Sequence, residues 1–202
     1  MATRRSKPSK AHTRKHIKLI YKDMDGYGGD TKYKKHDTTY GEITLKGIEI
    51  LVRLYQKIQP ISSYPVERRV FYDLGSGIGK NVIMIGSLVP GIKSKGIEVV
   101  KERHEKAMLA FNALNDKHNI EFIHKSLYDY PLKDAAWIFI SNLCFTEKMN
   151  ENLAKKLEKE VQQNTIVACS VELPLHSFTL LGLHTVPMTW EENSKVYVYK
   201  RY

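Results

Sequence analysis

The sequence predicts one α/β domain with a Rossmann-like, mostly parallel sheet of seven strands and a C-terminal antiparallel hairpin. Three observations favour this fold. Short apolar segments alternate with amphipathic ones, as in βαβ units. A glycine-rich segment at residues 73–79 directly follows the first apolar segment, and two strand-like segments joined by a turn end the chain. At 202 residues, the chain is long enough for one domain with a sizeable core.

The first amphipathic segment is expected to be a helix that begins near Glu42. Its apolar residues recur at spacings of three and four, as one buried helix face requires. Pro60 ends it. These apolar residues are Ile48, Leu51, Tyr55 and Ile58.

The following segments alternate between strand and helix patterns. Strands are expected at 69–73, 95–98, 120–124, 136–140 and 165–170, with helices at 81–88, at 101–117 and from Thr146 onward. The Thr146 side chain can cap the last of these helices. Segments 180–187 and 195–200 then form the hairpin. Strand–helix alternation implies a parallel sheet with helices on both faces.

Positive charge is concentrated near the N-terminus. Of the net formal charge of +10, residues 1–35 carry +8 and residues 36–202 carry +2. Because the first segment has few apolar residues to bury, we expect a disordered arm over 1–35, followed by the main domain over 36–202. Between Arg4 and Lys35, the composition is typical of a segment that binds DNA or another polyanion. A solubilising tail or a targeting signal would share this composition.

The sequence contains no membrane, secretory or metal-binding signal. No stretch approaches the roughly 20 apolar residues that span a bilayer, and the N-terminus lacks an apolar signal-peptide core. Cys144 and Cys169 lie in apolar surroundings without metal-ligand spacing. We therefore expect a soluble intracellular protein with no membrane partner, disulfide framework or metal site.

Segment 73–79 joins a predicted strand to a predicted helix. Its glycines permit backbone angles and a close approach that a Cβ would block, and N–H groups at the helix start can bind a polar ligand. The third glycine comes one residue earlier than in nicotinamide-binding loops. Glu98, 25 residues after Asp73, ends the next strand, where a carboxylate can accept both hydroxyls of a ribose. This order resembles motif I of class I S-adenosylmethionine-dependent methyltransferases. The glycines are Gly75, Gly77 and Gly79.

Four segments resemble Dot1-like histone lysine methyltransferases. The segment around the glycine-rich loop, 71–80, is common to many methyltransferases, whereas the combination of the other three is specific to the family. These three are Tyr40-Gly-Glu42 before a helix, Phe139-Ile-Ser-Asn-Leu-Cys-Phe145 after the fourth strand, and Trp190 followed seven residues later by Tyr197.

The resemblance implies S-adenosyl-L-methionine as the cofactor. Segment 40–43 would line the methionine end of the cofactor, segment 73–79 would lie beneath it, and Glu98 would hold the ribose. This implied site consists of Tyr40, Gly41, Glu42, Ile43, Asp73, Leu74, Gly75, Ser76, Gly77, Gly79, Glu98, Ser126 and Leu127. The implied catalytic residues are Asn142, Phe145, Trp190 and Tyr197, of which the three aromatic ones would wall a narrow lysine channel.

Two positions depart from the family's pattern. Ser141 replaces the first of two asparagines, so only Asn142 matches. Ser126, followed by Leu127, stands where the family has an acid near adenine. Adenine would then meet the Ser126 hydroxyl and backbone, or Asp129 would substitute.

The resemblance implies methyl transfer to a lysine side chain of a protein, with histone H3 in the nucleosome core as the substrate. We expect a monomer, nuclear or chromatin-associated in a eukaryotic host. An alternative is a methyltransferase acting on RNA or another nucleic acid, although the Asn/Asp-Pro-Pro-Tyr motif for base amines is absent. A non-catalytic basic binding protein is a third possibility, which the intact Asp73, three glycines and Glu98 disfavour.

Overall fold

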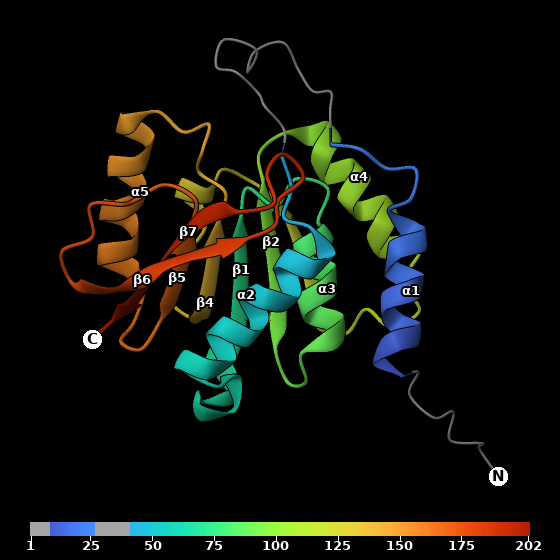
Figure 1. Ribbon diagram of the computed structural model, residues 1–202, viewed down its shortest axis with the longest axis horizontal. Helices are drawn as coiled ribbons and strands as arrows, with labels where there is room; N and C mark the ends of the chain where they lie inside the picture. The colour runs from blue at the N-terminus through green and yellow to red at the C-terminus, as the bar shows by residue number, and fades with distance from the viewer. Residues whose placement is uncertain (1–8, 27–40) are drawn as a thin grey trace.

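The structure of the chain, a computed structural model, describes residues 9–26 and 41–202 (Figure 1). Seven strands within these ranges form one sheet in the order β3-β2-β1-β4-β5-β7-β6. Strands β1 to β5 pair in parallel, and β7 pairs antiparallel with both β5 and β6. The strands are β1 (Val70–Leu74), β2 (Lys93–Glu98), β3 (Ile120–His124), β4 (Ala135–Ile140), β5 (Ile166–Cys169), β6 (Phe178–Val186) and β7 (Ser194–Arg201).

Helices cover both faces of the sheet, as the alternating pattern predicts. Single 3-10 turns occur at η2 (Ile61–Ser63), η3 (Val66–Arg68) and η4 (Leu127–Asp129). Within the described ranges, no helix is both long and apolar enough to cross a membrane. The helices are α1 (Lys10–Ile20), α2 (Leu45–Ile58), α3 (Lys80–Leu88), α4 (Lys101–Asn112) and α5 (Glu147–Glu160).

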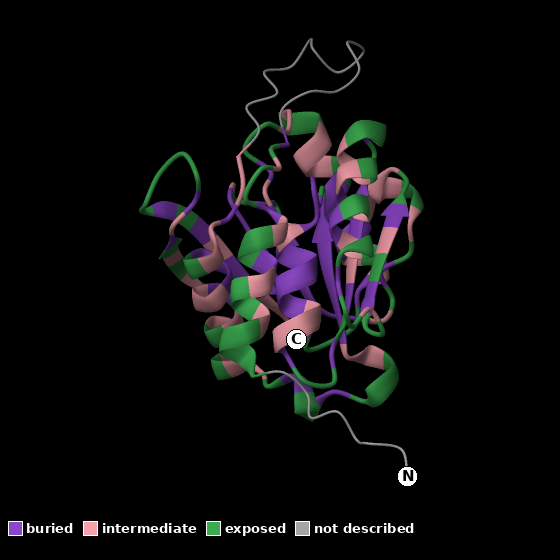
Figure 2. Ribbon diagram, turned by 90° about the vertical axis from the view of Figure 1, so that its right-hand side faces the viewer, coloured by how far each residue is buried: buried purple, intermediate pink, exposed green. Residues whose placement is uncertain are grey.

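The sheet separates two apolar clusters, and its strands are buried between the helical layers (Figure 2). The first cluster lies under α1 to α4, and the second under α5. Helix α2 is anchored in the first cluster by Tyr55, whose ring stacks on Trp137 at 5.1 Å and whose hydroxyl donates to the Ile138 carbonyl at 2.6 Å. A buried tyrosine stabilises a fold only when its hydroxyl has such a partner.

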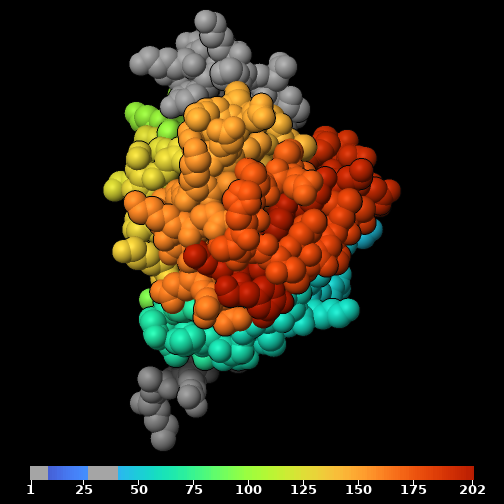
Figure 3. All heavy atoms as spheres, turned by 90° about the vertical axis from the view of Figure 1, so that its left-hand side faces the viewer, coloured from blue at the N-terminus to red at the C-terminus, as the bar shows by residue number. Residues whose placement is uncertain are grey.

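The C-terminal hairpin of β6 and β7 continues the sheet beyond β5. Its atoms form part of the molecular surface in Figure 3. Strand β6 is the edge strand, and most of its residues are exposed or half-buried. The predicted α/β fold, with a mostly parallel sheet and an antiparallel hairpin, is confirmed. The predicted Thr146 cap is also present, since its hydroxyl accepts the Met149 N–H at 3.3 Å.

Helix α4 is shorter than the predicted 101–117. It ends at Asn112, and Leu114 then turns into the core, where it is buried. The following Asn115-Asp116 pair consists of turn-forming residues, and the Asp116 carboxylate accepts the His118 N–H at 3.3 Å. This local hydrogen bond competes with helical continuation.

The expectation of a disordered arm is wrong for the part of it that the structure describes. Residues Lys10–Ile20 form α1, with Ser9 as N-cap, and Ile17 is fully buried in the first cluster. Tyr21 is also buried, and its hydroxyl donates to the Ile78 carbonyl at 3.1 Å. Residues 1–8 and 27–40, including Tyr40, lie outside the described ranges. The boundary at residues 35 and 36 stays a prediction.

The docking of α1 can be tested with Ile17→Ala, which removes its buried anchor. We expect the free energy of unfolding to fall by about 2 kcal/mol or more and the amides of 10–20 to lose hydrogen-exchange protection. Leu19→Ala, on the exposed side of α1, is the matched control and should change neither. Equal exchange of these amides in the wild type and the Ile17 variant would contradict the docking.

Candidate functional site

The strand order reverses between β1 and β4, and a pocket lies at that point. From β1 the chain proceeds to β2 and β3 on one side and returns to β4 on the other. In open α/β sheets, ligands bind outside the carboxyl ends of strands at such a switch point. Asp73 of β1, Phe139 of β4 and Ser141 just after β4 all line the pocket.

The glycine-rich loop between β1 and α3 requires glycine. Gly75, Gly77 and Gly79 have φ values of 84°, 54° and 81°, the left-handed region that side chains disfavour. At Gly79, a Cβ would also lie 2.4 Å from the Phe122 ring. A Cβ on Gly75 would meet nothing within 4 Å, so this part of the loop faces open space.

Glu98 holds the loop to the next strand and helix. Its Oε2 accepts the Gly77 N–H at 2.8 Å, and its Oε1 accepts the Val100 N–H at 2.8 Å. The carboxylate is buried. Because a carboxylate has about four acceptor sites, two hydrogen bonds leave it capacity for a ligand's hydroxyls.

Asp73 is a buried acid at the base of the pocket. Burial raises its pKa well above the usual value for aspartate; the neighbouring Asn81 side chain opposes the rise, while the negative charges of Glu98 and Glu42 add to it. In the unliganded protein, the charged form of Asp73 therefore costs free energy, and a cationic ligand group would reduce this cost.

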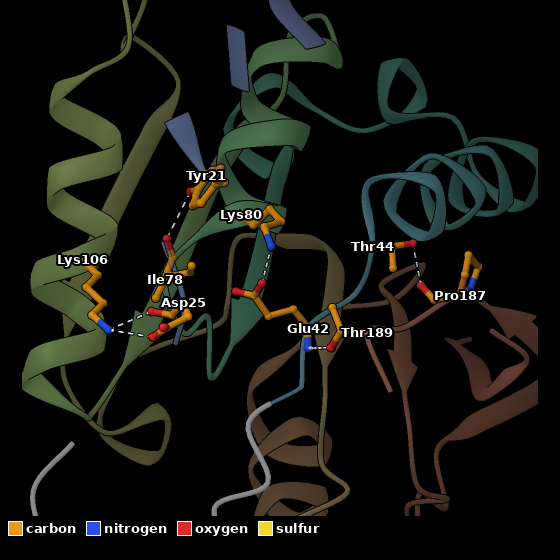
Figure 4. Close-up of polar contacts among 9 residues, drawn as sticks. All are labelled: Tyr21, Asp25, Glu42, Thr44, Ile78, Lys80, Lys106, Pro187 and Thr189. Atoms are coloured by element: carbon orange, nitrogen blue, oxygen red, sulfur yellow. Dashed lines mark hydrogen bonds and ion pairs between the residues drawn. The ribbon is translucent and has the colours of Figure 1, made fainter. Parts of the chain in front are cut away.

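Two distant segments that the family resemblance singled out meet beside this pocket. The Thr189 N–H donates to the Glu42 carbonyl at 2.8 Å, and the Glu42 N–H donates to the Thr189 hydroxyl at 3.0 Å (Figure 4). The Thr44 hydroxyl donates to the Pro187 carbonyl at 2.9 Å. The Trp190 ring lies against Gly41, where a Cβ would come within 2.0 Å of it. Segment 41–44 is thus fastened to segment 187–190.

An ion pair between Lys80 and Glu42 connects segment 41–44 to the start of α3 (Figure 4). The Lys80 ammonium also lies 5.4 Å from the centre of the Tyr21 ring. Burial, and then the charges of Glu42 and Asp73, raise the pKa of Tyr21 well above its usual value, which keeps its hydroxyl a donor. Segments from three regions of the chain therefore meet around the loop.

Most of the predicted cofactor residues lie together. The pocket lining includes seven of them: Gly41, Glu42, Ile43, Asp73, Gly75, Ser76 and Gly77. It also includes four residues that the sequence analysis did not assign to the cofactor: Lys80, Asn81, Phe139 and Ser141. Lys80 and Asn81 directly follow the loop, so the first helical turn could have indicated them. Tyr21 lies 57 residues before its partner Ile78, and no sequence signal connects the two.

The remaining predicted cofactor residues lie around the pocket. Gly79 begins α3, and Leu74 is buried in the second cluster. Ser126 follows β3, beside the end of β2, and its hydroxyl oxygen accepts the Tyr128 N–H at 3.2 Å. Leu127 packs against the second cluster.

The predicted substrate residues are distributed over two places. Phe145 and Tyr197 pack against the second cluster, whereas Trp190 lies on Gly41. The amide of Asn142 is fully buried. Its nitrogen donates to Asn150 Oδ1 at 2.9 Å and to the Val171 carbonyl at 3.1 Å, and its oxygen accepts the Val171 N–H at 2.8 Å.

The raised pKa of Asp73 predicts how stability depends on pH. Between the unfolded pKa of about 3.9 and the higher folded pKa, the native state binds more protons, so the free energy of unfolding falls as pH rises. Asp73→Asn removes this cost, and we expect a higher melting temperature than wild type at pH 7, with the gap closing toward pH 4. Thermal denaturation from pH 4 to 8 measures this. Asp116→Asn, at an exposed site, should show no such trend, and a lower melting temperature of Asp73→Asn at pH 7 would refute the argument.

Solved methyltransferase structures share this fold. An RNA methyltransferase from Salinibacter ruber in complex with S-adenosyl-L-homocysteine matches with a TM-score of 0.55 and 21% identity, covering 76% of this chain and 91% of its own. An O-methyltransferase from a Brevibacillus brevis trans-AT PKS multienzyme, also in complex with S-adenosyl-L-homocysteine, matches with a TM-score of 0.53 and 13% identity, covering 82% and 84%. TrmN from Thermus thermophilus gives a TM-score of 0.58 at 14% identity, covering 76% of this chain. The chain spans about half the length of TrmN (48%) and of the mitomycin 7-O-methyltransferase MmcR (54%).

At these identities, the structural likeness shows the fold alone. No curated protein matches the chain. The family model described as histone methylation protein DOT1 matches residues 30–177, which is more than half of the chain. S-adenosyl-L-methionine is accordingly the cofactor. The chain belongs to the DOT1 family and is an S-adenosyl-L-methionine-dependent methyltransferase.

Proposed function

We propose that this methyltransferase acts on a lysine side chain of a protein, with histone H3 in the nucleosome core as its substrate. Family membership supports the substrate class. The observation that carries the proposal is the junction of segments 41–44 and 187–190, which brings Trp190 onto Gly41 beside the Asp73 pocket. A general methyltransferase fold does not require this junction.

The residues present suit the cofactor. The open surface at Gly75 allows a ligand to approach the backbone, and buried Asp73 offers a negative charge to a cationic ligand. In our proposal, segment 41–43 and the loop hold the methionine end, Glu98 accepts the ribose hydroxyls, and Ser126 and Leu127 lie beside adenine. Tyr40, outside the described residues, belongs to the same proposed set.

The chemistry needs a neutral amine, aligned with the methyl group. When bound, the cofactor supplies a methyl group that its sulfonium already activates. The protein must then align the amine nitrogen with that methyl group, which is a matter of proximity and orientation. Free lysine has a pKa of about 10.4, and apolar surroundings lower it. We assign this task to Phe145, Trp190 and Tyr197, which would shield the amine from water without a dedicated general base.

Asn142 has a different proposed part in the reaction from the aromatic residues. Both ends of its amide are bound within the protein, to Asn150 and Val171. Asn142 therefore holds segment 141–145, which ends at Phe145, in place. We propose that Asn142 positions Phe145 and does not contact the substrate amine.

A basic surface on α1 and α2 is the proposed contact for DNA or another polyanion. Arg14, Lys15, Lys18 and Lys46 surround a hollow of about 340 Å³ with Leu45 and Met84 among its lining. Arg14 is paired with Glu49 at 2.7 Å, and Lys46 lies 3.6 Å from a Glu192 carboxylate oxygen at an exposed site. Lys15, Lys18 and the exposed Lys46 are the groups proposed to meet phosphates. If the substrate is the nucleosome, the polyanion is nucleosomal DNA. In a eukaryotic host, we propose that the protein acts as a monomer in the nucleus or on chromatin.

The same basic surface also favours a second candidate, methylation of RNA or another nucleic acid. A docked basic helix could hold such a substrate as well as it could hold nucleosomal DNA. The segment after β4, Ser141-Asn-Leu-Cys, lacks the Asn/Asp-Pro-Pro-Tyr pattern for base amines. We therefore prefer the protein substrate.

A methyl-transfer assay distinguishes these candidates. Purified chain and radiolabelled S-adenosyl-L-methionine are incubated with nucleosomes, free histones, DNA and RNA. We expect label in histone H3 of nucleosomes and at least a tenfold lower initial rate for Trp190→Ala, a change of about 1.4 kcal/mol in the barrier. Val66→Ala, a more exposed apolar residue on η3, is the control and should keep the wild-type rate. Label only in nucleic acid would establish the second candidate, and no label in any substrate would overturn both.

The basic surface predicts a salt-dependent affinity for DNA. The triple variant Lys15→Ala, Lys18→Ala and Lys46→Ala should bind a DNA duplex more weakly than wild type at low salt. Its plot of log affinity against log salt should be flatter by about 0.9 for each phosphate that the variant no longer neutralises. Fluorescence anisotropy over a range of KCl concentrations measures both quantities. The matched control removes Lys148, Lys155 and Lys159 of α5, on the other side of the sheet, and an equal effect there would show that only net charge matters.

A further inference from the structure

Unsatisfied polar atoms concentrate in the pocket at the end of β1. Within the described ranges, three of the buried side-chain polar atoms without a hydrogen-bond partner belong to two residues of its lining. These atoms are Ser76 Oγ, Asn81 Nδ2 and Asn81 Oδ1. The others, on Arg68, His104 and Ser170, belong to residues outside that lining. A buried donor or acceptor without a partner costs stability, so such a group in a pocket points to a polar ligand.

Asn81 is the clearest case. It is the second residue of α3, directly after Lys80, and only 3% of it is exposed. Its neighbours along the helix, Val82, Ile83 and Met84, are apolar and fully or almost fully buried. Neither end of the amide meets the geometry of a hydrogen bond to a described residue, although the side chain lies close enough to Asp73 to lower the pKa of that carboxyl group. Its polar groups are therefore turned toward the pocket and not satisfied by the helix or the core.

The groups around Asn81 carry both signs of charge. Asp73 and the Glu42–Lys80 ion pair line the same pocket. The Asn81 side chain faces Asp73 closely enough to oppose part of the rise that burial produces in the pKa of that carboxyl group. A ligand with a positive and a negative group close together would complement these surroundings.

We propose that Asn81 is a cofactor-binding residue that holds the amino-acid end of S-adenosyl-L-methionine through both ends of its amide. A side-chain amide has one carbonyl acceptor and one donor group, and a zwitterionic amino acid has an ammonium donor and a carboxylate acceptor. Oδ1 would accept from the ammonium, and Nδ2 would donate to the carboxylate. The inference rests on the cofactor assignment and is independent of which substrate is methylated.

The test compares two ligands that differ in this end alone. S-adenosyl-L-homocysteine carries the amino-acid end, and 5′-methylthioadenosine lacks it while keeping the nucleoside and the sulfur. Calorimetric titration of the full chain with each ligand, for wild type and Asn81→Leu, isolates the contribution of the amide. We expect the Kd for S-adenosyl-L-homocysteine to rise about 10- to 100-fold, as for loss of hydrogen bonds to charged groups, and the Kd for 5′-methylthioadenosine to change by less than about twofold.

The melting temperature without ligand provides a second measurement. Because Asn81→Leu removes unsatisfied polar atoms at similar volume, we expect an equal or higher melting temperature than wild type. Asn115→Leu, at an exposed position after α4, is the control for added apolar surface and should leave both Kd values unchanged. Asn81→Ser, which is small and polar, replaces Asn81→Leu if the latter is insoluble and should weaken S-adenosyl-L-homocysteine selectively as well.

Three outcomes would overturn the inference. Unchanged affinity for S-adenosyl-L-homocysteine would show that the amide does not bind the amino-acid end. Equal weakening of both ligands, or a much lower melting temperature without ligand, would show that Asn81 supports the loop itself. Failure of the wild type to bind either ligand would overturn the cofactor assignment and this proposal with it. A binding defect in the variant alone would leave the cofactor assignment intact.

Discussion

The site depends on one buried carboxylate, that of Glu98. It accepts the Gly77 N–H with one oxygen and the Val100 N–H with the other, so it connects the glycine-rich loop, the end of β2 and the start of α4. The Gly75 and Ser76 N–H groups also donate to the Ile97 carbonyl, but helix α3 has no side-chain cap, because its N-cap residue is Gly79. The group proposed to hold the ribose therefore also fixes the loop that faces the rest of the cofactor, and the two functions cannot be separated by mutating this residue.

The second constraint is that segments far from the glycine-rich loop in the sequence come to lie beside the pocket. Thr189 bonds to Glu42 across 147 residues of sequence, and Tyr21 bonds to the loop from the opposite side. Strands β1 and β4 contribute Asp73 and Phe139 to the pocket lining, whereas Gly41, Glu42 and Ile43 come from the segment before α2. The turn between β6 and β7 holds that segment in place. This explains why the sequence can match a general methyltransferase motif at residues 73–79 and still resemble one family at its ends.

The parts of the fold that the sequence predicted are those with a local cause. The buried strands are apolar runs between turn formers, and α2 and α5 have both an amphipathic pattern and a Thr cap. Helix α1 was missed because its composition is basic and polar, and only Ile17 and Tyr21 of residues 10–21 are buried apolar or aromatic residues. Asn142 matched a family segment, yet the partners that determine its role, Asn150 and Val171, are known only from the fold. Composition and motifs do not report contacts of this kind.

The charges of the pocket favour a ligand with positive charge. Asp73, Glu98 and Glu42 lie near one another, and their mutual repulsion adds to the burial that raises the pKa of Asp73. Lys80 offsets only part of this negative charge, through its pair with Glu42. A ligand with both an ammonium and a sulfonium group relieves the repulsion, and one that has lost the sulfonium charge relieves less of it. By this reasoning, the acids that cost stability in the unliganded protein would favour the methylated cofactor over its demethylated product.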